Sequence, residues 1–81
     1  MTKQEFKTLR GRYRRAVRDT WFSYLELIHA GRFDDATACS DCCRQLLQEF
    51  AAAIGRPHLY PSAVLSNTLG AFSWVGGAAH E

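Results

Sequence analysis

Three cysteines are the residues whose type and spacing first suggest chemistry in this chain. They are Cys39, Cys42 and Cys43, and the first two form a C-x₂-C pair. A structural zinc site needs four ligands, usually a second such pair or two spaced histidines. The chain offers neither, although His58 could approach the cysteines from a loop. We therefore predict no metal and no cofactor, and keep a metal site at the three cysteines as the alternative.

The same cysteines do not have the setting of a redox pair. A reactive pair begins at a helix N-terminus after a strand, which lowers the thiol pKa, whereas this motif lies inside a predicted helix. We expect Cys39 and Cys43 to pack as small apolar side chains. If any thiol is reactive, we expect it to be Cys42, at the edge of the apolar face.

No nucleophile, base and orienting group stand at motif spacing, and no glycine-rich loop is present. The adjacent Asp34 and Asp35 are better explained as the start of a helix, where carboxylates are favourable. His29 suits the C-terminal end of a helix. We therefore predict that the protein is not an enzyme, although a catalytic group assembled in space needs no local motif.

The distribution of positive charge is the most informative feature of the chain. Seven of its ten cations lie in the first eighteen residues, with Glu5 as the one acid among them. Spacings of three and four residues place five of these cations on one flank of a helix. We call this set the basic flank: Lys3, Lys7, Arg10, Arg14 and Arg18. Arg12 and Arg15 are expected to widen the positive surface.

Three interpretations of the basic flank are open. It could be a solvated surface that keeps an apolar hairpin in solution, a docking face for an acidic protein, or a face for nucleic-acid phosphate. No Asn or Gln is interleaved with the arginines to bind adenine. Cations at a helix N-terminus oppose the helix dipole, which favours a binding role.

The basic flank must be carried by a first helix, predicted over residues 3–30. Thr2 and Glu5 form a capping-box pattern, and Gly31 is a natural stop. Gly11 interrupts the helix at a cost of up to about 1 kcal/mol. The apolar stripe of this helix contains Phe6, Leu9, Tyr13, Val17, Trp21, Tyr24 and Ile28.

A second helix is predicted over residues 34–54, with Asp34 or Asp35 as its cap and Gly55 as its stop. The short connection between the two helices predicts an antiparallel hairpin. The apolar stripe of the second helix contains Phe33, Ala36, Ser40, Cys43, Leu47, Phe50 and Ile54.

A third helix is predicted over residues 62–75, with Leu65, Leu69 and Phe72 on one face. A strand is the alternative for its last residues. A helix that is apolar nearly all round must be buried on several sides. Because that is difficult in a small monomer, this helix is our first candidate for a self-association surface, and we expect a homodimer.

The aromatic residues divide between core and surface. Trp21 and Tyr24 share the stripe of the first helix and are expected in the core. Phe22, Tyr60 and Trp74 are equally suited to the core or to a partner interface, where aromatic side chains contribute much of the affinity.

Length and composition indicate one small domain over residues 1–81, with 47% hydrophobic residues, and the three predicted helices make it all-α. No apolar run reaches the roughly 20 residues that cross a membrane, and no signal-peptide core follows the charged N-terminus. Three cysteines make no disulfide framework. We therefore expect a cytoplasmic protein with no membrane contact.

Two resemblances follow. Residues 30–36, with Gly31, Phe33, Asp34 and Ala36, resemble the inter-helix turn of a tetratricopeptide repeat, which implies a helical hairpin. The chain as a whole, with its arginine-rich first helix and no catalytic signature, looks like the small accessory proteins of phages and mobile elements. That resemblance implies a protein that binds and inhibits a host protein.

Our expectation is a protein-binding inhibitor or modulator that uses the basic flank and exposed aromatics on an acidic or phosphate-rich cytosolic surface. The alternative is a small nucleic-acid-binding regulator.

Overall fold

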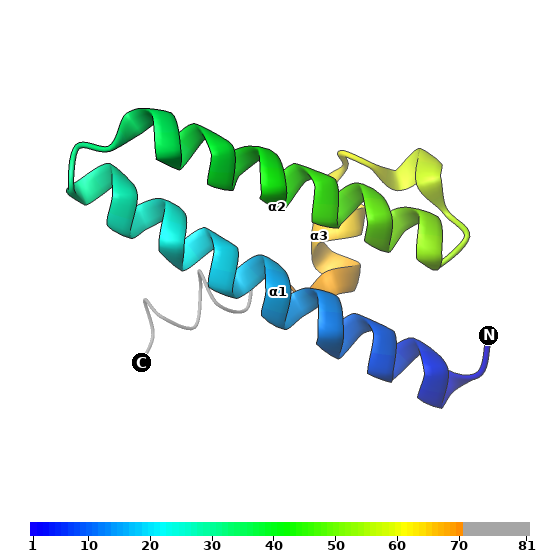
Figure 1. The fold of residues 1–81 in the computed structure, drawn as a ribbon. Coiled ribbons are helices and arrows are strands. Elements are labelled where there is room, and N and C mark those ends of the chain that lie inside the picture. Colours follow the sequence, from blue (N-terminus) through cyan, green and yellow to red (C-terminus); the bar gives the residue numbers. More distant parts are fainter. Residues whose placement is uncertain (71–81) are drawn as a thin grey trace.

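The computed structural model describes residues 1–70, and every secondary-structure element in this range is a helix (Figure 1). The elements are α1 (Lys3–His29), α2 (Phe33–Ala53), the 3-10 turn η1 (Pro57–Leu59) and α3 (Ala63–Leu69). Helices α1 and α2 form a long antiparallel hairpin, and α3 packs against the half of it that contains the chain's N-terminus. The predicted all-α hairpin with a shorter third helix is confirmed.

The ends of α1 follow from local chemistry. The hydroxyl of Thr2 accepts a hydrogen bond from the Glu5 amide at 3.1 Å, so the predicted cap is present. At the other end Gly31 adopts a φ of +75°, and the Arg32 amide donates to the Leu27 carbonyl at 2.9 Å. This closure needs a left-handed residue, which glycine supplies without a Cβ clash.

The start of α2 differs from the prediction. The helix begins at Phe33, and its cap is Arg32, whose side chain makes no capping hydrogen bond. The prediction that Asp34 or Asp35 caps the helix was wrong. The turn that closes α1 ends at Arg32, and α2 begins with the next residue. Both carboxylates lie in the first turn, where they still favour the positive helix end.

Helices α2 and α3 also end at left-handed glycines. Gly55 has a φ of +75° and follows α2, as predicted. The hydroxyl of Ser62 accepts a hydrogen bond from the Leu65 amide at the start of α3. Helix α3 ends at Leu69, earlier than predicted, because Gly70 adopts a φ of +85°. The remaining predicted residues, including Phe72 and Trp74, lie outside the described residues.

The core lies where all three helices meet. Its buried members are Val17, Phe50, Ala51, Leu65 and Leu69. The ring of Tyr13 packs on that of Phe50, with centroids 5.7 Å apart. Because Leu65 and Leu69 are buried within their own chain, they are not available to the self-association surface that the sequence suggested for this helix.

Within residues 1–70, the other half of the hairpin, near its tip, is covered less well than the half that α3 packs on. Trp21 is 39% exposed and stacks on Tyr24, and Phe33 is 62% exposed. The prediction that Trp21 and Phe33 lie in the core stripes was wrong. Two helices alone bury only the centre line of their interface, and side chains beside that line stay in contact with water.

Candidate functional site

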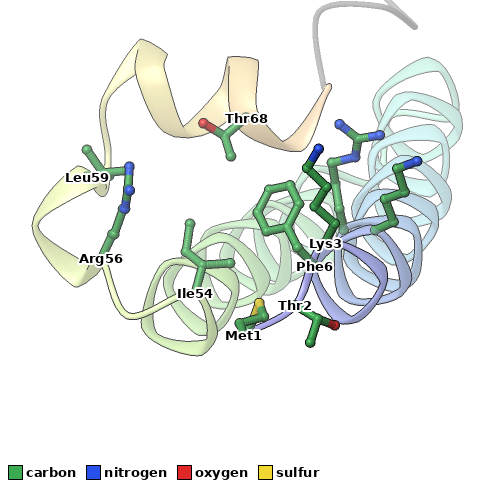
Figure 2. A pocket seen from close by; sticks show the side chains of 10 residues that line it. Met1, Thr2, Lys3, Phe6, Ile54, Arg56, Leu59 and Thr68 are labelled. Atoms are coloured by element: carbon green, nitrogen blue, oxygen red, sulfur yellow. The ribbon is translucent and has the colours of Figure 1, made fainter.

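A groove of about 590 Å³ opens at the end of the hairpin that carries the N-terminus. It lies between the first turns of α1, the end of α2, η1 and α3, as Figure 2 shows. We call it the cationic groove. Its lining residues are Met1, Thr2, Lys3, Phe6, Lys7, Arg10, Ile54, Arg56, Leu59 and Thr68.

The charge of the groove is of one sign. Lys3, Lys7 and Arg10 come from α1, and Arg56 comes from the segment after α2. Among residues 1–70, no carboxylate lines the groove. All four cations are exposed. Within residues 1–70, none of the four makes an ion pair. Their combined field therefore favours an anion in this groove.

The groove also has an apolar floor. Phe6, Ile54 and Leu59 are half-buried, so part of each side chain remains accessible. In Figure 2, Phe6 and Ile54 extend from α1 and from the end of α2 toward the space below α3. The guanidinium carbon of Arg10 lies 5.9 Å from the centre of the Phe6 ring, a cation–π distance. A ligand must therefore offer both negative charge and apolar surface to use the whole groove.

The antiparallel hairpin alters one argument made from the sequence. Cations near the start of α1 oppose the dipole of that helix. In the fold, however, the C-terminal end of α2 lies at the same end of the hairpin (Figure 1) and has no basic residue in its last turn. The negative end of the α2 dipole offsets the unfavourable interaction of these cations with the positive end of the α1 dipole. The case for binding therefore depends on the groove and not on helix electrostatics.

The five residues of the predicted basic flank lie in different environments. Lys3, Lys7 and Arg10 line the groove. The Nε atom of Arg14 is buried, and a Cβ atom built on Gly70 would lie 3.4 Å from it. Arg18 pairs with the neighbouring Asp19 at 3.4 Å.

The two arginines expected to widen this surface lie elsewhere on α1. Arg12 borders a separate shallow hollow beside Glu5 and Leu9. Arg15 is exposed, but it follows Arg10 by five residues, which turns it about 140° around the helix. Neither contributes to the groove.

The aromatic candidates are also dispersed. Phe22 is 48% exposed, as an interface anchor would be. Tyr60 packs against the core cluster, and Trp74 lies outside the described residues. Neither Phe22 nor Tyr60 is among the groove's lining residues.

Sequence reasoning missed the second wall of the groove. Arg56, Leu59 and Thr68 belong to segments far from α1 in the chain, and they join it only through the hairpin and α3. The available signal was Arg56 itself, an isolated cation directly after the Gly55 stop.

The cysteines adopt the predicted environments. Cys39 and Cys43 are half-buried and Cys42 is exposed. The Cys43 thiol approaches the Val17 carbonyl oxygen at 3.9 Å. Burial, and then the proximity of Cys39 and Cys42, raises the pKa of Cys43, which lowers its thiolate fraction at neutral pH. Among residues 1–70, no three His, Cys, Asp or Glu side chains are grouped so that they could hold a metal ion.

Comparison with protein-family models, with curated proteins and with solved structures finds no match for this chain. In the described part of the chain, each helix is too short or too polar to cross a membrane. The geometry and charge of the cationic groove therefore carry the functional proposal.

Proposed function

We propose that this protein is a non-enzymatic protein-binding module whose cationic groove holds an acidic segment of a cytosolic partner, which it inhibits or modulates. The observation that carries the proposal is the combination of Lys3, Lys7, Arg10 and Arg56 around an apolar floor. An acidic peptide segment with one or two large apolar side chains satisfies both parts. The carboxylates steer association, and the apolar contact slows dissociation.

The shape of the positive surface favours such a segment over duplex nucleic acid. Duplex phosphates repeat along a line, so binding them takes cations spread along a face. Here Arg14 is turned toward α3 and Arg18 is paired with Asp19, so the cations of α1 do not form one open row. The four groove cations instead line a single groove.

The second candidate is a small regulator that binds single-stranded nucleic acid. One observation favours it, because Phe6 with Arg10 beside it could stack on a base while the lysines meet phosphate. The two candidates predict different ligands for the same groove, and direct binding measurements distinguish them.

The experiment measures fluorescence anisotropy with three labelled probes: an acidic peptide with spaced Leu and Phe residues, the same peptide with these replaced by Ser, and a single-stranded oligothymidylate. The protein is compared with a groove variant, Lys7→Glu/Arg56→Glu. The matched control, Arg12→Glu/Arg15→Glu, has the same change in net charge outside the groove.

We expect the first peptide to bind most tightly. The groove variant should weaken it at least about tenfold, since two attractive exposed pairs become repulsive, while the control changes it much less. Tighter binding of the oligothymidylate, lost equally in both variants, would show a phosphate-binding surface spread over α1 and contradict the proposal. Equal binding of the two peptides would show that contact with the apolar floor does not contribute to the affinity.

A further inference from the structure

The tip of the hairpin, opposite the groove, has the complementary chemistry. Phe33 is 62% exposed there, and the exposed Asp34 and Asp35 follow it in the first turn of α2. We call these three residues the acidic tip. Residues 19–41, the half of the hairpin that carries the acidic tip, contain five acids and one arginine. An apolar ring beside two carboxylates is the kind of segment that the cationic groove is suited to hold.

We propose that the acidic tip of one copy of this protein docks in the cationic groove of a second copy, so that the molecules associate head to tail. Phe33 would contact the apolar floor formed by Phe6 and Ile54. The two carboxylates would meet the surrounding cations. This inference rests on the groove assigned in the proposed function and names a further ligand for it.

The carboxylates at the tip contribute unequally. Asp35 already pairs with Arg32, with Nη2 and Oδ2 2.5 Å apart. Asp34 makes no ion pair within residues 1–70. Asp34 is therefore the main charged contact available to a second copy, and Phe33 is the apolar one.

A molecule cannot place its own tip in its own groove. Helix α1 has 27 residues, so at 1.5 Å per residue it is about 40 Å long, and the tip and the groove lie at its opposite ends (Figure 1). The contact must therefore join two molecules through two different surfaces. Such a contact leaves one tip and one groove free in every dimer, so growth continues until a ring closes.

The association should be weak and sensitive to salt. A single tip in a groove buries less area than a standard stable interface, and its charge pairs are exposed and screened. Self-association would also occupy the groove, so an acidic partner must displace the tip of the neighbouring copy. Dilution would favour partner binding, and a high protein concentration would oppose it.

The test uses sedimentation velocity on the full chain over a range of concentrations. The tip variant is Phe33→Ser/Asp34→Lys, and the groove variant is Lys7→Glu/Arg56→Glu. All four positions are exposed, and circular dichroism verifies that each variant folds. The control, Phe22→Ser/Asp19→Lys, makes the same kind of change outside both surfaces.

We expect the unmodified protein and the control to increase in mass with concentration beyond a dimer, and to dissociate as salt is raised. Each of the two variants alone should remain monomeric. An equimolar mixture of the two should form dimers and nothing larger, because only one tip and one groove remain intact between them.

Three results would overturn the inference: an unmodified protein that stays monomeric to about 1 mM, which corresponds to only about 4 kcal/mol of binding; single variants that still associate; or a mixture that stays monomeric. The tip variant keeps its groove, so it should still bind the acidic peptide in the anisotropy assay. For the unmodified protein, peptide binding without self-association rejects this inference alone, whereas the absence of both rejects the proposed function as well.

Discussion

Replacing Leu65 with alanine should destabilise the fold by about 2–3 kcal/mol. Leu65 is 1% exposed and lies in the core with Val17 and Phe50. Truncating a buried leucine costs about 2–5 kcal/mol, depending on how far the site can close around the lost volume. Helix α3 has seven residues, and a short helix can shift toward the hairpin. The expected loss is therefore in the lower part of that range.

The neighbouring Val64 provides the matched control, since it lies on the same helix and is 57% exposed. Val64→Ala should change the stability by less than about 0.5 kcal/mol. Urea denaturation followed by far-ultraviolet circular dichroism measures both variants. With a denaturant slope near 1 kcal/mol per molar for a small domain, Leu65→Ala should lower the midpoint by about 2–3 M.

Equal midpoints for the two variants would refute the packing of α3 against its own hairpin. A Leu65→Ala protein that kept its stability but lost mass in sedimentation would support a different arrangement. In that case α3 would be the self-association surface that its apolar composition suggested, and the head-to-tail contact would lose its structural basis.

Three further predictions concern single residues. Gly11→Ala should stabilise the protein by up to about 1 kcal/mol in thermal or urea unfolding, because Gly11 is inside α1 and a Cβ there meets nothing within 4 Å. Gly70→Ala should instead destabilise it by about 1–2 kcal/mol, since its φ of +85° strains any residue with a Cβ. Mass-spectrometric mapping of iodoacetamide labelling should find Cys42 modified first. Cys43 should require a higher pH, because burial raises its pKa; prior labelling of Cys43 would contradict its placement.

The sequence by itself determined the start of α1 and the ends of α1 and α2. The Thr2 hydroxyl and the Glu5 amide, which cap α1, are three residues apart. Gly31 and Gly55 end the helices that come directly before them. These are local interactions, so spacing along the chain was enough to predict them. The start of α2 and the end of α3 were predicted wrongly. The turn that closes α1 ends at Arg32, so α2 begins before either aspartate can cap it, and α3 already ends before Gly70.

Only the tertiary structure decided which charged and apolar residues act together. Helical periodicity gives each cation an angle on α1, but it does not say which neighbour faces that angle. Arg14 lies against Gly70 at the end of α3, and the hairpin brought Arg56 into the same groove as Lys3 and Lys7. The position of α3 also decided that Leu65 is buried while Trp21 remains exposed, because a two-helix interface becomes a core only where a third element covers it.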